Sequence, residues 1–175
     1  MKRALLLDLD ETLMVEEPAA EVAFLASAQL AVEHGADPQA LATDARARAR
    51  ELWYAAPTHL HAMALVTNGA ACLQREKLAA SGLGERFEAV IVSADVGVAK
   101  PDSAIFEHAL SELGARRDRA VMVGDSIAKD VDGALAVGLD AVWVNRSGRS
   151  APPDRPDLVE ISTLDDLPDV LGSLG

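Results

Sequence analysis

The chain has 175 residues, of which 50% are hydrophobic and 25% are charged, a composition typical of one globular domain rather than a disordered protein. Its formal net charge of −12 predicts that nucleic acid and anionic membranes are repelled from most of the surface. No apolar run approaches the roughly 18 residues of a membrane span, and the single cysteine, Cys72, excludes an internal disulfide. We therefore expect a cytoplasmic protein with no membrane or nucleic-acid partner.

Five short apolar runs recur along the chain, each of a length typical of a buried strand. They lie at 4–7, 62–66, 89–92, 120–123 and 141–144. Helix-like stretches separate the later runs at 70–81, 103–113 and 126–137, and a short helix is expected near 164–171. This alternation predicts an α/β protein: a Rossmann-like, doubly wound parallel sheet with helices on both faces.

The segment between the first and second strands departs from the alternation. Its pattern predicts two helices, at about 19–34 and 38–54, the second preceded by Asp37 as N-cap. We interpret residues 16–57 as a small helical cap inserted into a core domain made of 1–15 and 58–175. Trp53 and Tyr54 lie near the end of this insertion and offer a surface for a homodimer, so we expect either a monomer or a homodimer.

The first candidate site residues come directly after the first strand. Asp8 and Asp10 stand two residues apart, with Thr12 next in the same spacing. Ligands of parallel sheets bind at the carboxyl ends of the strands. Two carboxylates there can bind a divalent cation, or divide the work of nucleophile and proton carrier. The structural alternative is an acidic turn in which Thr12 caps the next helix.

Polar residues also follow the next strands. Thr67 and Asn68 end the second strand, ahead of a helix whose N-terminal amides can hold an oxyanion. Lys100 stands just before a later helix. Considered one at a time, Thr67 can also be read as a helix N-cap and Lys100 as a solvated surface charge.

A second acidic group follows the fourth strand. Asp125 stands at the strand end, Ser126 adjoins it, and Asp130 lies where it can also favour the start of a helix. Together with the earlier groups, these residues describe a site for phosphoryl transfer. Carboxylates serve a hard cation and act as nucleophile, while a hydroxyl and an ammonium bind phosphate oxygens.

The ordered set resembles the four motifs of the haloacid dehalogenase-like (HAD) hydrolase superfamily, in the branch with a helical cap after the first strand. The matching residues are Asp8-x-Asp10-x-Thr12, Thr67, Lys100, and Gly124-Asp125 with Asp130. The resemblance implies that Asp8 forms an aspartyl-phosphate and that Asp10 acts as general acid and then base. It also implies that Mg²⁺ is held by the Asp8 carboxylate, the Asp10 main-chain carbonyl and Asp125, with Asp130 in support.

By the same resemblance, Thr67 and Lys100 hold the phosphoryl oxygens, and Lys100 also restrains Asp8. Asn68 and Ser126 adjoin these motifs, and we expect them to make supporting contacts to the phosphate or the metal. Dehalogenating members of the family lack an acid at the position of Asp10, so phosphate chemistry is favoured. The resemblance thus implies a Mg²⁺-dependent phosphatase acting on small phosphorylated metabolites.

Three alternatives stay open at this point: a phosphomutase of the same family, a non-catalytic member, and a receiver-type phospho-accepting signalling module. The insertion is shorter than in related chains, because only residues 55–61 join its second helix to the next strand. Either the cap is reduced to two helices, or an internal segment is missing. A reduced cap predicts a more open and less selective site.

Overall fold

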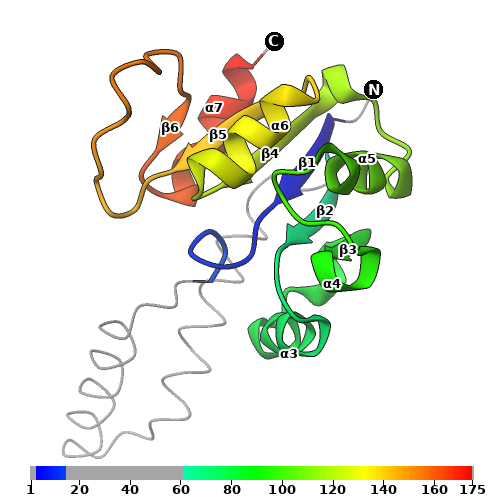
Figure 1. Cartoon of the computed structure of the whole chain (residues 1–175). Helices are drawn as coiled ribbons and strands as arrows, with labels where there is room; N and C mark the ends of the chain where they lie inside the picture. Colours follow the sequence, from blue (N-terminus) through cyan, green and yellow to red (C-terminus); the bar gives the residue numbers. More distant parts are fainter. Residues whose placement is uncertain (1–2, 15–60, 175) are drawn as a thin grey trace, which may run out of the picture. The chain divides into compact units, whose positions relative to one another are not determined.

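The structure is a computed structural model that describes residues 3–14 and 61–174, and its centre is a six-stranded, all-parallel sheet. The strands stand in the order β3-β2-β1-β4-β5-β6 (Figure 1). Their bounds are Arg3–Leu7 (β1), His61–Thr67 (β2), Ala89–Val92 (β3), Ala120–Gly124 (β4), Asp140–Val144 (β5) and Glu160–Ile161 (β6). The predicted α/β class and all five predicted strands are confirmed; the two-residue β6 was not predicted.

The helices follow the predicted alternation with two differences. Their bounds are Ala71–Ser81 (α3), Ser93–Val96 (α4), Ser103–Glu112 (α5), Asp132–Ala136 (α6) and Leu167–Ser173 (α7). The single-turn helix α4 was not predicted. The helix expected over 126–137 is divided into a π-helical turn, Ile127–Val131, followed by α6.

The strands are apolar because the sheet is covered on both faces. All five residues of β4 are buried. Side chains alternate along β2: Ala64 and Val66 belong to the core that also contains Phe106 of α5 and Ala134 of α6. Leu65 packs with Leu78 of α3 in a second cluster. Because alternate residues of a strand point to opposite faces, α3 lies on the face opposite to α5 and α6.

The strand order reverses between β1 and β4, which pair directly. From β1 the chain continues to β2 and β3 on one side, and β4 continues to β5 and β6 on the other. Crevices at such a reversal, outside the carboxyl ends of the strands, are where open α/β sheets bind ligands. Asp8 follows β1 and Asp125 follows β4, so both lie at this point.

The chain divides into two units, one made of Met1–Met14 with Leu60–Gly175 and the other of Val15–His59. The predicted cap at 16–57, its two helices, and Trp53 and Tyr54 lie outside the described residues and stay predictions. Among the helices that the structure describes, none is both long and apolar enough to cross a membrane.

Candidate active site

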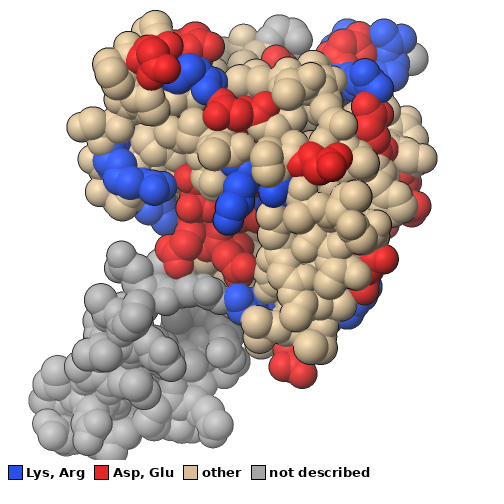
Figure 2. Space-filling view, viewed as in Figure 1, with Lys and Arg blue, Asp and Glu red and all other residues tan. Residues whose placement is uncertain are grey.

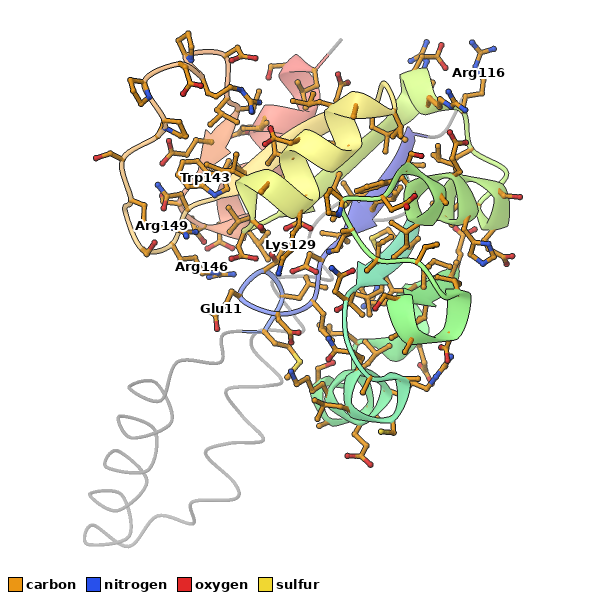
Figure 3. The ribbon with its side chains drawn as sticks, viewed as in Figure 1. Glu11, Arg116, Lys129, Trp143, Arg146 and Arg149 are labelled. Carbon is orange, nitrogen blue, oxygen red and sulfur yellow. The ribbon has the colours of Figure 1, made fainter. Side chains whose placement is uncertain are left out.

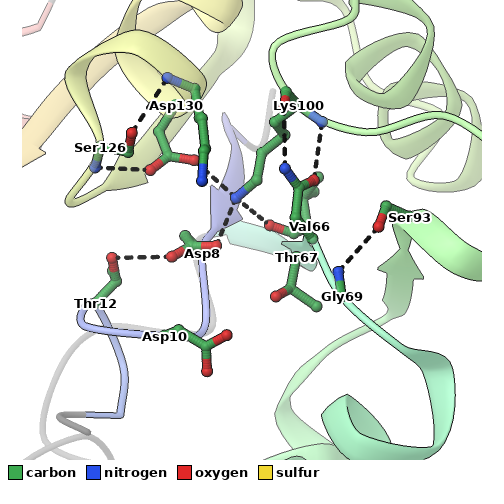
Figure 4. A network of polar contacts seen from close by, with 12 residues as sticks. Asp8, Asp10, Thr12, Val66, Thr67, Gly69, Ser93, Lys100, Ser126 and Asp130 are labelled. Carbon is green, nitrogen blue, oxygen red and sulfur yellow. Dashed lines mark hydrogen bonds and ion pairs between the residues drawn. The ribbon is translucent and has the colours of Figure 1, made fainter.

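An ion pair between Asp8 and Lys100 forms the centre of the candidate site (Figure 4). Nζ of Lys100 lies 2.5 Å from Oδ1 of Asp8 and 2.7 Å from Oδ1 of Asp130, and it donates to the carbonyl oxygen of Val66 at 2.7 Å. The ammonium has three N–H donors, and three oxygens surround it. The side chain of Lys100 is only 2% exposed, which excludes the other interpretation of the sequence, that Lys100 is a solvated surface charge.

The backbone of Lys100 is fixed by the side chain of Asn68. Nδ2 of Asn68 donates to the carbonyl oxygen of Lys100 at 2.9 Å, and Oδ1 accepts from the N–H of Lys100 at 2.9 Å. Asn68 was predicted to contact phosphate or metal, which stays a prediction; the structure places its side chain against the backbone of Lys100. Asp102, the N-cap of α5, accepts from the N–H of Ala104 at 2.9 Å. The loop that carries Lys100 is thus held at both ends.

Three carboxylates converge at the carboxyl ends of β1 and β4. Oxygens of Asp8, Asp125 and Asp130 all lie within 4.8 Å of one another. Against these, Lys100 contributes one positive charge, which leaves a net charge of about −2 when all three acids are ionised. Figure 2 shows acidic side chains gathered on this face, with basic side chains beside them.

The electrostatics of the cluster indicate a shortage of positive charge. Burial raises the pKa of Asp8 to about 6; Lys100 lowers the pKa, and the charge of Asp130 raises it. Burial likewise raises the pKa of Asp125, and the charge of Asp130 adds to that effect. A divalent cation neutralises two negative charges, and hard cations such as Mg²⁺ prefer carboxylate oxygens. The donor set therefore fits such an ion.

Asp130 lies deeper than Asp125. It is 2% exposed, its Oδ2 accepts from the N–H of Ser126 at 2.9 Å, and its Oδ1 faces Lys100. The carboxylate occupies the space where a side chain at residue 124 would stand, since a Cβ on Gly124 would lie 2.4 Å from the carboxyl carbon of Asp130. Ser126 caps the π-helical turn by accepting from the N–H of Lys129 at 3.3 Å.

Asp125 is positioned through its main chain. Its carbonyl oxygen accepts from Nε1 of Trp143 at 2.9 Å and from Nη2 of Arg149 at 3.2 Å. The guanidinium of Arg149 also lies 5.8 Å from the centre of the Trp143 ring, within cation–π range. Figure 3 shows both residues near Arg146, which also follows β5, and near Lys129 of the π-helical turn Ile127–Val131. Neither Trp143 nor Arg149 was predicted, since their sequence positions carry no motif.

The loop after β1 presents Thr12 to the nucleophile candidate. Oγ1 of Thr12 lies 3.4 Å from Oδ2 of Asp8, and the residue is fully buried. Glu11 adopts a left-handed φ of 57°, and its N–H donates to the carbonyl oxygen of Met14 at 2.6 Å. Arg146 donates to the carbonyl oxygen of Thr12 at 2.7 Å. These backbone contacts fix the loop, and within the described residues the side chain of Thr12 contacts Asp8.

The side chain of Asp10 lies apart from the three clustered carboxylates and contacts α3. Its Oδ2 accepts from Nε2 of Gln74 at 2.8 Å, and its Oδ1 lies 2.9 Å from Nζ of Lys77. The same Nε2 lies 2.8 Å from Oγ1 of Thr67. Thr67 is not the N-cap of α3, because that position is Ala70, which makes no side-chain cap.

Gln74 and Lys77 were not predicted as site residues. Their spacing of three residues places them on one face of a helix, next to a strand end that carries a motif. This spacing was the feature of the sequence from which Gln74 and Lys77 could have been predicted as site residues.

Known proteins resemble this chain along most of its length. A model of the haloacid dehalogenase-like hydrolase family matches residues 49–138. The chain is 45% identical over 122 residues to phosphoserine phosphatase of Thermus thermophilus, a match that covers 69% of this chain and 45% of the relative. It is 36% identical over 108 residues to pyrimidine 5′-nucleotidase YjjG of Escherichia coli, covering 61% of this chain and 48% of the relative.

Solved structures give the same family. A crystal structure of a HAD phosphatase from Thermococcus onnurineus superposes with a TM-score of 0.69 at 28% identity, covering 97% of this chain and 98% of the other. The chain spans about half the length of the two curated relatives, 45% and 48%. The family model covers Thr67, Lys100, Asp125 and Asp130. The chain therefore belongs to the haloacid dehalogenase-like hydrolase family.

Proposed function

We propose that this protein is a Mg²⁺-dependent phosphatase that hydrolyses small phosphomonoesters through an aspartyl-phosphate on Asp8. One observation carries the proposal: at the reversal of strand order, a buried carboxylate pairs with Lys100 at 2.5 Å and stands beside two further carboxylates. A nucleophile, a cation for phosphate oxygens and a divalent-metal donor set thus meet in one place.

The metal fits the charge and the donor chemistry of the cluster. The Asp8 and Asp125 carboxylates and the Asp10 main-chain carbonyl would hold Mg²⁺, with Asp130 supporting them from its buried position. When bound, the ion offsets negative charge on the carboxylates and on the phosphate. Family membership supports this role.

The residues of the chain divide the chemistry as follows. A carboxylate oxygen of Asp8 attacks phosphorus, while Lys100 and the hydroxyl of Thr67 bind the phosphoryl oxygens. The ester bond to the leaving oxygen breaks, and that oxygen takes a proton from Asp10. Asp10 then removes a proton from water, which attacks the phosphorus of the Asp8 ester. Inorganic phosphate leaves, and Asp8 and Asp10 return to their starting forms.

Small phosphorylated metabolites are the proposed substrates. Phosphoserine and pyrimidine 5′-nucleotides, from which two relatives take their names, are both small phosphomonoesters. The two kinds of compound share the phosphate ester and differ in the group that carries it. The proposal therefore extends to the ester class and to no single compound.

The test is hydrolysis of p-nitrophenyl phosphate with Mg²⁺ and with EDTA. Wild type should turn over only with the metal, and Asp8→Asn should lower the rate by about a thousandfold or more, because an amide is a poor nucleophile. Asp118→Asn is the matched control, since the Asp118 side chain is 60% exposed and pairs with Arg116 on the surface (Figure 3). Its rate should equal that of wild type.

The three alternatives give different results in this assay, to which a sugar phosphate is added as a second substrate for the mutase. A stable phosphoaspartate without turnover indicates a phospho-accepting module, and transfer to a second hydroxyl of a sugar phosphate indicates a mutase. A folded protein that binds Mg²⁺ but forms no phosphoenzyme indicates a non-catalytic member. Equal rates for wild type and Asp8→Asn contradict the proposal.

A further inference from the structure

We infer that Gln74 and Lys77 of α3 are positioning residues that hold the carboxylate of Asp10 and orient the hydroxyl of Thr67. The inference deepens the proposed function and rests on it, because it concerns how the proton-transferring acid is placed. α3 lies on the sheet face opposite to α5 and α6. Asp10 is therefore positioned from the face opposite to α5, the helix that follows Lys100, the partner of Asp8.

Gln74 is built into the site at close quarters. The residue is 2% exposed, and its Nε2 lies 2.8 Å from Oδ2 of Asp10, 2.8 Å from Oγ1 of Thr67 and 2.9 Å from the carbonyl oxygen of Asn68. The Asp10 carboxylate and the Asn68 carbonyl are both acceptors, so the amide nitrogen, not the oxygen, must face them.

The other end of the Gln74 carboxamide shows that the residue is held for these contacts. Its Oε1 is buried and has no hydrogen-bond partner among the described residues. Buried polar atoms without partners are unfavourable, so a role in core stability alone does not account for a glutamine here. An apolar side chain of similar size would pack at the same place without that cost.

The donation from Gln74 determines what Thr67 can offer a ligand. Nε2 has two N–H donors and three oxygens within reach, so one N–H is shared between Thr67 and a neighbouring acceptor, and this shared donation occupies one lone pair of the Thr67 hydroxyl oxygen. The hydroxyl hydrogen then points away from Gln74 and is available to a phosphoryl oxygen. Gly69 makes room for this contact, since a Cβ at Gly69 would lie 2.9 Å from Nε2 of Gln74.

Lys77 holds the second oxygen of Asp10. It lies three residues after Gln74 on α3, and its Nζ is 2.9 Å from Oδ1 of Asp10. The side chains are 19% and 31% exposed, so the pair is near the surface of the site. With one donor on each carboxylate oxygen, both the position and the plane of the Asp10 carboxylate are set. Removal of Lys77 frees one oxygen and lets the carboxylate rotate.

The experiment compares two phosphate esters, with Lys77→Met as the main variant. p-Nitrophenolate leaves without a proton, whereas the alkoxide of glycerol 2-phosphate needs one from Asp10. In single-turnover kinetics, Lys77→Met should lower the rate of phosphoenzyme formation from glycerol 2-phosphate by about tenfold or more and that from p-nitrophenyl phosphate by less than about threefold, with KM unchanged for both. Hydrolysis of the phosphoenzyme, in which Asp10 acts as base, is common to both esters. Lys77→Arg, which keeps a donor, should restore most of the loss.

Two further variants separate positioning from general damage. Arg75→Met removes a cation from the same helix, one whose side chain is 58% exposed and pairs with Asp95, and it should leave both rates unchanged. Gln74→Met should lower kcat for both esters, because Thr67 acts on the phosphoryl group whatever the leaving group is. In an Asp10→Asn background, Lys77→Met should cause no further loss.

An equal loss for both esters in the rate of phosphoenzyme formation in Lys77→Met, a rise in KM, or an additive loss with Asp10→Asn overturns the inference. If wild type hydrolyses neither ester, the proposed function fails, and the inference is decided by the crystal structure of Lys77→Met. There the Asp10 carboxylate should have turned from its place beside Gln74. An Asp10 that keeps its wild-type position overturns the inference even then.

Discussion

Two lysine–aspartate pairs flank the loop after β1, and they differ in burial. Lys100 and Asp8 lie 2.5 Å apart, with side chains 2% and 10% exposed. Lys77 and Asp10 lie 2.9 Å apart, with side chains 19% and 31% exposed. Removing one member of a buried pair leaves an uncompensated charge in a poorly solvated place, whereas water takes over the role of a lost partner near the surface. The same two residue types therefore serve different ends.

The residues that surround the two pairs also differ in charge. Asp8 and Lys100 share their space with the carboxylates of Asp125 and Asp130, so that side of the site carries excess negative charge. On the other side, Asp10 has the neutral donor Gln74 beside it. The side with Asp8 is suited to bind a divalent cation. On the side with Asp10, the geometry of the carboxylate matters more than its charge.

The largest stability effect is expected for Lys100→Met measured with EDTA. The substitution leaves three carboxylates without their cation, and it should lower the free energy of unfolding by about 3–5 kcal/mol. Urea denaturation measures the loss. Mg²⁺ should stabilise this variant more than wild type, because a positive charge that repels the metal has been removed. A loss below about 1 kcal/mol would contradict the view that the pair is buried and coupled.

A smaller effect is expected for Gly124→Ala, which acts on the same side. The added Cβ would stand 2.4 Å from the carboxyl carbon of Asp130, so the carboxylate must move away from Lys100 and from the N–H of Ser126. We expect a loss of about 1–3 kcal/mol in unfolding free energy, together with weaker Mg²⁺ binding by titration calorimetry.

The control for that substitution is Gly172→Ala. Gly172 lies in α7, and a Cβ there would meet nothing within 4 Å. Alanine favours a helix over glycine by up to about 1 kcal/mol, so this variant should be as stable as wild type or more so. Unchanged Mg²⁺ affinity in Gly124→Ala would show that Asp130 takes no part in forming the cation site.

Asn68→Ala should cost less, because it removes no charge. It deletes two hydrogen bonds of 2.9 Å to the backbone of Lys100, which predicts a loss of about 1–2 kcal/mol. Hydrogen exchange followed by NMR locates the effect. The amide of Lys100 should exchange faster, while the amide of Asp8, bonded to the carbonyl oxygen of Val123 at 3.0 Å, should keep its protection. Equal acceleration at both amides would indicate general loosening.

The sheet and the residues at its strand ends were predictable from the sequence. Asp8, Thr67 and Asp125 each end an apolar run, and the carboxyl ends of parallel strands meet at one edge of a sheet. Their proximity follows from topology once the strands are recognised. Lys100 stands in a loop, and a lysine in a loop is usually solvated. Its burial depends on Asn68, a contact between residues 32 positions apart.

Gln74 and Lys77 could not be identified in that way. Polar side chains on a helix usually face solvent, and which face of α3 packs on the sheet is decided by Leu78 in the tertiary core. The π-helical turn at Ile127–Val131 was also missed; in it the N–H of Val131 donates to the carbonyl oxygen of Ser126, five residues earlier, at 3.3 Å. Residues at strand ends can be recognised from the order of the sequence, whereas tertiary packing decides which face of a helix lines the site.

The smallest stability effect is expected for Lys77→Met, and it tests the comparison of the two pairs most directly. The pair with Asp10 is partly exposed, so its loss should change the unfolding free energy by less than about 1 kcal/mol. The identical substitution at Lys100 should cost several times more, under the same buffer and with EDTA. Similar losses at the two lysines would mean that burial does not distinguish the pairs. A small loss at Lys77, combined with a large fall in the rate of phosphoenzyme formation from glycerol 2-phosphate, would place its role in the geometry of Asp10.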